Sequence, residues 1–276
     1  GAYGFRDQLQ DCLAIIDYHP ERVKYQILRS CTAQFPQGDV LHWFHPIFRG
    51  KLIYKGVRTR ISDDLLWLPF AVADYVKRTG DRSILLKKLP YLEGAPLKDG
   101  AKDEYREFFH GTHRESLYQH CLRAINKANT TGDHSLPLME SGDWNDSFDK
   151  AGEKGVGESV WLGMFLKRVC DGFSDICVLM NDRENGEKLL KNSRRLEAAI
   201  EKNAWNGEWY VRAFYDDGAV MGDKNASSCE IDLLCQSWSS LCGMSDKKRV
   251  KSALLSAYYR LFDEKHGVIK LFSPPF

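Results

Sequence analysis

Residues 5–18, FRDQLQDCLAIIDY, carry the periodicity that decides the fold class. Leu9, Leu13 and Ile16 recur at the spacing of one helix face, so the stretch predicts an amphipathic α-helix. Pro20 follows at a position that proline favours in a first helical turn, and a second helix is expected from there to near Pro36. Helical periodicity therefore dominates the start of the chain.

The same periodicity continues downstream. Ser62 is a candidate N-cap for a helix that ends at Gly80, and Pro69 either kinks this helix or marks its start. Residues 205–215 alternate aromatic and polar side chains, which predicts a short hairpin. No alternation of strands and helices is visible, so the sequence predicts an all-α fold with long loops, closer to an α/α barrel than to a four-helix bundle. Further helices are expected at Arg82–Leu89, Arg114–Ala128, Glu158–Phe173, Glu187–Asn203, Cys229–Leu241 and Lys247–Phe262.

Composition excludes several classes of protein. The 276 residues are 43% hydrophobic, and 39 basic against 38 acidic residues give a net charge of +1, which argues against nucleic-acid or anionic-membrane partners. No apolar run approaches the roughly 20 residues that span a bilayer. Eight scattered cysteines have no metal-binding spacing, so we expect buried thiols in a reducing compartment and a cytoplasmic protein.

The densest candidate site is LPLMESGDWND, residues 136–146. Asp143, Asn145 and Asp146 surround Trp144 after a glycine that permits an unusual turn. An indole offers a flat apolar face to a pyranose ring, and carboxylates bind hydroxyls or donate a proton. A loop of Asx-turns around a buried tryptophan explains the same composition equally well.

Other clusters are weaker. Arg6 and Asp7 stand at a helix start and could bind sugar hydroxyls, although a first-turn aspartate beside an exposed arginine is the simpler interpretation. His42 and His45 resemble a metal pair without a third ligand, so no metal is expected. A third cluster consists of two cations and two anions that either neutralise one another or order a ligand: Arg58, Arg60, Asp63 and Asp64. A fourth is an aromatic and acidic surface made by Trp205–Tyr210 with Arg212, Asp216, Asp217, Glu230 and Asp232.

Taken together, these strings resemble glycoside hydrolase family 94, the cellobiose-type phosphorylases. YGFRDQLQD looks most like the branch that acts on β-1,2-glucans. The motifs follow one another in the family's order along nearly the whole chain. They are Tyr3–Asp11, His42–Pro46, Gly56–Pro69, Leu136–Asp146, Gly157–Gly163, Trp205–Gly218, Cys229–Trp238 and the terminal LFSPPF.

The resemblance implies an (α/α)6 barrel and inverting phosphorolysis of β-glucosidic bonds, which releases an α-sugar 1-phosphate. Asp146 is then the general acid, and Arg6, Asp7 and Trp144 line the subsite of the transferred sugar; we add Asp143, Arg60 and Asp63 as candidate substrate ligands. No cofactor is expected, because inorganic phosphate is a co-substrate. A phosphorylase needs one acid, since phosphate replaces the water and base of an inverting hydrolase.

Both ends of the chain look truncated, so residues 1–276 are expected to be part of a catalytic domain. An upstream β-sandwich and the downstream phosphate-binding motifs of the family are expected elsewhere, and they could mediate a homodimer. Ser147 and Phe148 depart from the Gly-Met expected after the acid. Two alternatives remain open: a hydrolase whose base is Asp143, Glu230, Asp216 or Asp217, and an inactive glucan-binding fragment.

These expectations predict that the isolated 276-residue chain does not catalyse phosphorolysis. A phosphate dianion needs several converging donors, and the family's donors lie after Phe276. The measurement is release of sugar 1-phosphate from β-linked glucans by the purified chain, beside the same chain extended at both ends. Comparable activity of the two would show that the phosphate site lies within these residues.

Overall fold

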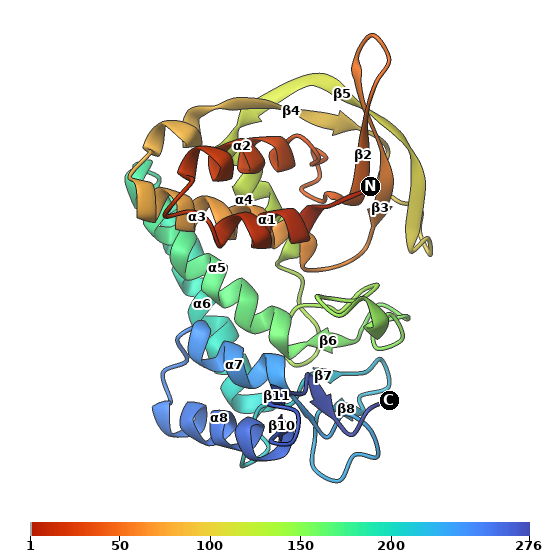
Figure 1. Cartoon of the computed structure of the whole chain (residues 1–276), viewed down its shortest axis with the longest axis vertical. Coiled ribbons are helices and arrows are strands. Elements are labelled where there is room, and N and C mark those ends of the chain that lie inside the picture. Colours follow the sequence, from red (N-terminus) through yellow and green to blue (C-terminus); the bar gives the residue numbers. More distant parts are fainter. Residues whose placement is uncertain (1) are drawn as a thin grey trace. The chain divides into compact units, whose positions relative to one another are not determined.

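The computed structural model describes residues 2–276, which form two compact units (Figure 1). The first unit comprises Gly1–Asn129 and Gly172–Gly186, and the second comprises Thr130–Asp171 and Glu187–Phe276. Helices α5 (Val160–Leu179) and α6 (Arg183–Asn203) each contribute residues to both units.

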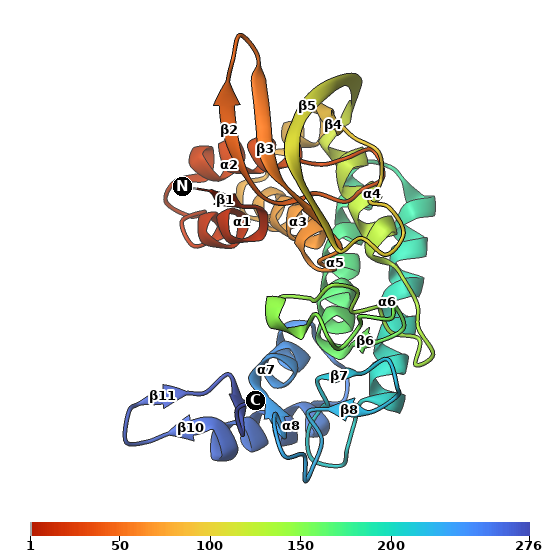
Figure 2. The same ribbon diagram turned by 90° about the vertical axis from the view of Figure 1, so that its right-hand side faces the viewer.

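A five-stranded antiparallel sheet occupies the first unit, in the order β1-β2-β3-β5-β4. Figure 2 shows β2 and β3 extending as a long hairpin. Its turn contains Gly50, whose positive φ of 70° suits glycine. The strands are β1 (Tyr3–Gly4), β2 (Leu41–Phe48), β3 (Leu52–Thr59), β4 (Lys88–Glu93) and β5 (Asp103–Ser116).

One face of this sheet packs into the core of the unit. Phe44 and Tyr54 are buried with their ring centroids 4.5 Å apart, and Phe108 on β5 is fully buried. Trp43 and Tyr105, on the opposite face, remain partly or largely exposed. The alternation of the strands therefore separates an apolar inner face from a mixed outer face.

The helices of the first unit begin and end largely where the sequence predicts. Proline opens α2, Pro69 lies in the first turn of α3, and Gly80 ends α3 in the left-handed conformation with φ 72°. Ser62 is not the N-cap: Asp63 and Leu66 precede the two helical segments there. The bounds are α1 (Phe5–Leu13), α2 (Pro20–Cys31), η1 (Asp64–Leu66), α3 (Trp67–Thr79), η2 (Arg82–Leu86) and α4 (Leu117–Ala128).

The prediction of an all-α fold is wrong, and the sheet is the reason. The helix expected at residues 82–89 is a short 3-10 helix that leads into β4, because Lys88 and Leu89 pair with Ser116 and Glu115. The helix expected from Arg114 begins only at Leu117. Strand pairing between segments far apart in sequence overrides local helical periodicity in both places.

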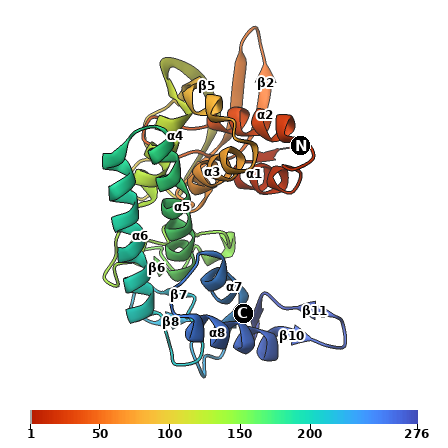
Figure 3. The same ribbon diagram turned by 90° about the vertical axis from the view of Figure 1, so that its left-hand side faces the viewer.

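Helices also form most of the second unit, with short strand pairs between them. Figure 3 shows α7 and α8 close together and the β10–β11 hairpin reaching beyond them. Of the hairpin expected at residues 205–215, only one antiparallel bridge forms, between Trp205 and Tyr210. Ala213 and Phe214 pair instead with Met221 and Val220. The remaining bounds are η3 (Asp146–Phe148), β6 (Glu158–Ser159), β7 (Ala213–Phe214), β8 (Val220–Met221), β9 (Ile231–Asp232), α7 (Leu233–Leu241), α8 (Lys247–Leu261), β10 (Phe262–Asp263), β11 (Val268–Ile269) and β12 (Phe272–Ser273).

Aromatic and thiol groups fill the interior of the second unit. Trp161 and Trp209 are fully buried, and Trp161 stacks on Phe165. Among all described residues, the eight cysteines are free and buried, which confirms the prediction that they act as small apolar side chains. No helix of residues 2–276 combines the length and apolar character needed to cross a membrane.

Two glycines of the first unit give a matched test of packing. Both have positive φ, but a Cβ at Gly38 would lie 2.5 Å from the carbonyl oxygen of Arg123, whereas a Cβ at Gly80 would meet nothing within 4 Å. Gly80→Ala should lower the free energy of unfolding by about 1 kcal/mol through backbone strain alone. Gly38→Ala should lower it by at least about 2 kcal/mol, because the neighbouring backbone must also move. Denaturant unfolding measures both, and equal losses would contradict the packing at Gly38.

Candidate functional site

The loop that carries Asp146 lies in the second unit, and buried residues on either side of Asp146 hold it in place. Asp143 and Phe148 are buried, while Trp144 is partly exposed and Asp146 is exposed at the start of the short helix η3. The side chain of Asn145 caps this helix by accepting a hydrogen bond from the Ser147 amide at 3.2 Å. The loop therefore presents the proposed acid between two anchored residues.

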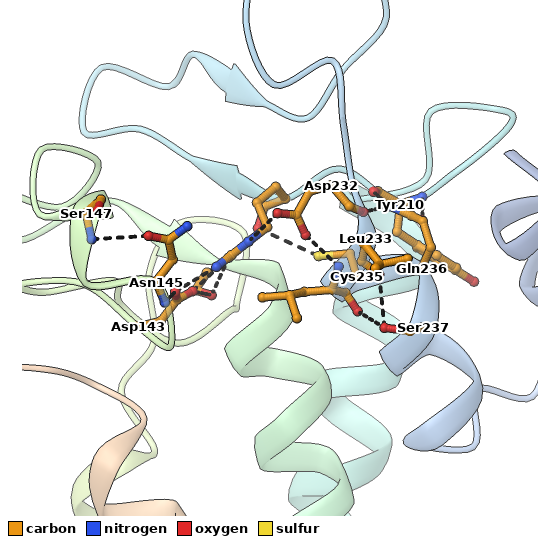
Figure 4. Close-up of polar contacts among 12 residues, drawn as sticks. Asp143, Asn145, Ser147, Tyr210, Asp232, Leu233, Cys235, Gln236 and Ser237 are labelled. Atoms are coloured by element: carbon orange, nitrogen blue, oxygen red, sulfur yellow. Dashed lines mark hydrogen bonds and ion pairs between the residues drawn. The ribbon is translucent and has the colours of Figure 1, made fainter. Parts of the chain in front are cut away.

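Asp143 is anchored by a fully buried arginine. Arg212 Nη2 and Nη1 lie 2.6 and 2.7 Å from the two carboxylate oxygens of Asp143. The Ser159 hydroxyl donates to Asp143 at 2.6 Å, and Asp143 accepts from the Asn145 amide at 3.0 Å, part of the network drawn in Figure 4. Burial alone would raise the pKa of Asp143, but Arg212 holds it below its ordinary value. This is a bidentate pair of full charges inside the protein.

A second buried carboxylate, Asp232, stands beside the same arginine. Its Oδ2 lies 3.5 Å from Arg212 Nε, and neither atom has a hydrogen-bond partner. Its Oδ1 accepts from the Leu234 amide at 2.8 Å and so caps α7 (Figure 4). Burial raises the pKa of Asp232 to about 6, against the opposing attraction of Arg212. One cation thus faces two buried acids.

The aromatic and acidic surface that the sequence predicts at residues 205–218 is correct only in part, because Asp217 is exposed and Asp216 is half-buried. Trp209, Tyr210 and Arg212 are fully buried. The Trp209 indole donates to the Gly222 carbonyl at 2.8 Å, and Gln236 accepts from the Tyr210 amide at 2.9 Å. The stretch is a structural element behind the acid loop. Alternating aromatic and polar residues do not distinguish a surface from such a buried, hydrogen-bonded strand.

Asp216 organises the far end of the acid loop. Its carboxylate accepts hydrogen bonds from the backbone amides of Lys154, Val156 and Gly157 at 2.7, 3.0 and 2.9 Å. Burial opposes its charge, but these three amides hold the pKa of Asp216 below its ordinary value. Asp217 accepts from the Ala219 amide in a turn. Neither contact pattern is that of a base free to activate water.

In the first unit, Arg6 and Asp63 are brought together as a buried pair. Arg6 Nη1 lies 2.8 Å from Asp63 Oδ1, and the Trp67 indole donates to Asp63 Oδ2 at 3.0 Å. His42 Nδ1 lies 2.7 Å from Asp64 Oδ2, and Asp64 Oδ1 has no hydrogen-bond partner. Arg6 Nη1 lies 3.8 Å from this oxygen, so Asp64 also faces the buried guanidinium of Arg6. Among residues 2–276, no cluster of three or more His, Cys, Asp and Glu side chains is placed to hold a metal ion.

Asp7 and Arg60 occupy different surroundings. Asp7 is exposed, and its carboxylate folds against Gly4 so closely that a Cβ there would collide with it. Arg60 donates to the carbonyl oxygens of Ala101 and Lys98 at 2.9 and 3.1 Å. Mutual neutralisation, one of the two alternatives for this run of charges, is therefore wrong, because Arg58, Arg60 and Asp63 bond to groups outside residues 58–64. The roles of Asp7 and Arg60 in sugar binding stay predictions.

Arg58 also pairs with a carboxylate outside residues 58–64. Its guanidinium, which is fully buried, bonds to the Asp39 carboxylate at 2.6 and 2.8 Å and to the Ala95 carbonyl at 2.6 Å. Asp39 lies nineteen residues earlier, and no local spacing points to it. A buried arginine can be expected to have an acidic partner, but only the sheet register selects which one.

The paired acids around Arg212 predict an unusual pH dependence of stability. The pKa of Asp232 is about 6 in the folded chain and 3.8 in the reference state, so the folded chain holds the proton more tightly. The contribution of Asp232 to the free energy of unfolding therefore falls as pH rises from about 4 to about 6. Carboxylates with a lowered pKa, such as Asp143 and Asp216, contribute in the opposite direction. Asp232→Asn should remove the fall that Asp232 causes and raise the free energy of unfolding at pH 8 by up to about 3 kcal/mol.

The control for this measurement is Glu230→Gln, which removes a charge from the half-buried pair with Arg260. It should leave the pH dependence between 4 and 6 unchanged. Urea unfolding at several pH values compares the two variants with the wild type. A difference in the free energy of unfolding between Asp232→Asn and the wild type that does not grow from pH 4 to pH 6 would contradict the raised pKa of Asp232.

Comparison with known proteins identifies the family to which the chain belongs. The model of the "Glycosyl hydrolase 94 superfamily, catalytic domain" matches residues 1–276. Cyclic beta-(1,2)-glucan synthase NdvB of Rhizobium meliloti is 39% identical over 276 residues, which are 100% of this chain and 10% of that protein. Solabiose phosphorylase of Paenibacillus borealis is 30% identical over 275 residues, 99% of this chain and 32% of the relative. The chain thus spans between a tenth and a third of the length of these relatives.

A solved structure shares the fold without close sequence similarity. The rhamnosidase from Klebsiella oxytoca with rhamnose bound superposes with a TM-score of 0.60 at 12% identity, over 94% of this chain and 42% of the rhamnosidase. The family match covers every residue of the chain, and the motifs that surround Asp146 and Arg212 lie inside it. The chain therefore belongs to the glycosyl hydrolase 94 superfamily and matches its catalytic domain.

Proposed function

We propose that the full-length protein is an inverting glycoside phosphorylase that acts on β-linked glucose, with Asp146 as its general acid. The observation that carries the proposal is the setting of Asp146, an exposed carboxylate on a short helical turn between two buried residues, Asp143 and Phe148. A general acid must reach solvent-facing substrate while its backbone is held still. The family match supports the same reaction class.

In this mechanism Asp146 donates its proton to the leaving glycosidic oxygen. A phosphate oxygen attacks C1 from the opposite face, so the C1–O bond to phosphate forms as the glycosidic bond breaks, and the product is an α-sugar 1-phosphate. No base is required, because phosphate is already a nucleophile. Inorganic phosphate is the co-substrate, and no cofactor takes part.

The occupied carboxylates around the loop favour phosphorolysis over hydrolysis. Asp143 is bonded to Arg212 and Ser159, Asp216 to three backbone amides, and Glu230 to Arg260 at 3.0 Å. An inverting hydrolase needs a carboxylate that binds water opposite the acid. Asp143 and Asp216 each have both carboxylate oxygens bonded to protein donors, and Glu230 has one of its two oxygens bonded to Arg260.

We propose β-1,2-linked gluco-oligosaccharides as the substrate class, and the support is the 39% identity to a cyclic beta-(1,2)-glucan synthase along the whole chain. Trp144, which is partly exposed, would stack on the transferred sugar. Arg6, Asp7, Arg60 and Asp63 would bind its hydroxyls. The (α/α)6 barrel, a homodimer and a cytoplasmic location stay predictions.

Asp146→Asn tests the acid directly. In the full-length protein the variant should lose phosphorolysis of β-1,2-linked glucan by at least about 100-fold, because the amide keeps the size of the side chain but donates no proton. Turnover of β-glucosyl fluoride with phosphate should fall much less, since fluoride leaves without needing that proton. Release of sugar 1-phosphate and the anomer of the product are measured by NMR.

Substrate panels and phosphate dependence complete the test. Oligosaccharides with β-1,3 and β-1,4 linkages should react more slowly than those with β-1,2 linkages. Release of free sugar in the absence of phosphate would identify a hydrolase instead. Unchanged turnover of the natural glucoside by Asp146→Asn would remove Asp146 from the mechanism.

A further inference from the structure

Resting on the proposed function, we infer that Arg212 and Asp216 are positioning residues that together orient the general acid. Both stand on the short stretch around β7, and both bond to the loop that carries Asp146, one on each side of it. They touch neither the reacting atoms nor each other's partners. Their role is to hold the loop, so that the Asp146 carboxylate meets the leaving oxygen in one orientation.

Arg212 holds the loop on both sides of the acid. Three residues before Asp146 it makes the bidentate contact with Asp143, at 2.6 and 2.7 Å. Two residues after Asp146 its guanidinium carbon lies 4.9 Å from the ring centroid of Phe148. Asp146 therefore lies between two residues of the loop that contact the same guanidinium.

The bonds continue from Arg212 toward the acid itself. Asp143 accepts from the amide of Asn145, the residue directly before Asp146, at 3.0 Å. Asn145 in turn accepts from the amide of Ser147, the residue directly after it, at 3.2 Å. The backbone on either side of Asp146 is thus fixed by a chain of hydrogen bonds that begins at a buried guanidinium (Figure 4).

Asp216 closes the other end of the same loop. It accepts hydrogen bonds from three amides within residues 154–157, and its own amide donates to the Ala151 carbonyl at 3.1 Å. Buried apolar packing joins the two anchors, because Phe148 and Ala151 lie in one cluster with Ala213 of β7. The five consecutive residues 212–216 therefore hold the loop between residues 143 and 157 at both of its ends.

The planar geometry of the Arg212 guanidinium, and not its charge, explains why a lysine cannot replace it. An ammonium would still neutralise the two buried acids Asp143 and Asp232, so the unit should fold. It presents no planar fork, however, and cannot hold both oxygens of Asp143 in one plane while lying on the Phe148 ring. Arg212→Lys therefore separates orientation from charge.

The experiment compares two substrates in the full-length protein. Arg212→Lys should lower kcat for the β-1,2-linked glucan by about 100-fold, the scale of a misplaced catalytic group, and change KM by less than about threefold. Turnover of β-glucosyl fluoride with phosphate should fall by less than about fivefold, because that leaving group needs no proton from Asp146. If Arg212 had only a structural role, the variant would lower the turnover of both substrates by the same factor.

Asp216→Asn is the second variant, at a half-buried position where folding is less at risk. Losing its charge weakens three amide contacts, so kcat for the glucan should fall by about tenfold with the fluoride again spared. The matched control is Arg123→Lys in the first unit. Arg123 holds Glu115 through two bonds of 2.7 Å, and this variant should keep both activities within about twofold.

The outcomes separate this inference from the proposed function. Equal losses on both substrates, or an unchanged kcat for the glucan in both Arg212→Lys and Asp216→Asn, would overturn the positioning role while leaving phosphorolysis intact. Phosphate-independent release of sugar by the wild type would overturn the proposed function. The comparison of substrates would still test the positioning role in that case, because an inverting hydrolase also needs a general acid.

Discussion

The buried pair of Asp143 and Arg212 is the constraint on which the arrangement of the second unit depends. A charged group without a partner in such an interior costs several kcal/mol, so neither side chain can leave the other. Around Arg212 gather the acid loop through Asp143, the start of α7 through Asp232, and the ring of Phe148. The guanidinium thereby joins three stretches of sequence: its own, the acid loop with Asp143 and Phe148, and the start of α7. Its planar geometry specifies how these stretches are oriented relative to one another.

The same logic operates in the first unit with different residues. Arg6 pairs with Asp63 and Arg58 with Asp39, so two buried arginines tie the helix start and the β3 strand to distant parts of the chain. In both units, charged residues of a candidate ligand site also form buried ion pairs that stabilise the fold. Charged residues near a sugar site therefore carry two kinds of role, and contacts, rather than composition, distinguish them.

The candidate site can be identified largely from local sequence. The predictions are wrong where a residue or strand interacts with a partner far away in the chain. The acid loop was identifiable because its turn residues, its indole and its carboxylates are contiguous in residues 136–146. Local sequence does not predict the sheet, because β5 pairs with β3 and β4 through contacts between segments that are far apart in the chain. The stretch around Arg212 was misassigned to the surface, since aromatic residues with interspersed charges look alike whether buried or exposed.

The sequence by itself determined most helix positions, the apolar character of the cysteines, the family and the exposed candidate acid, because periodicity, caps and contiguous motifs are local properties. Gly80 and Pro69 are clear cases, since each imposes its own backbone angle. Only the tertiary structure decided which carboxylate each arginine pairs with, that residues 41–116 contain a sheet, and that Asp216 is committed to backbone amides. The physical reason is that ion pairs and strand ladders join residues far apart in the chain, and their energies depend on a burial and a register that no local window contains.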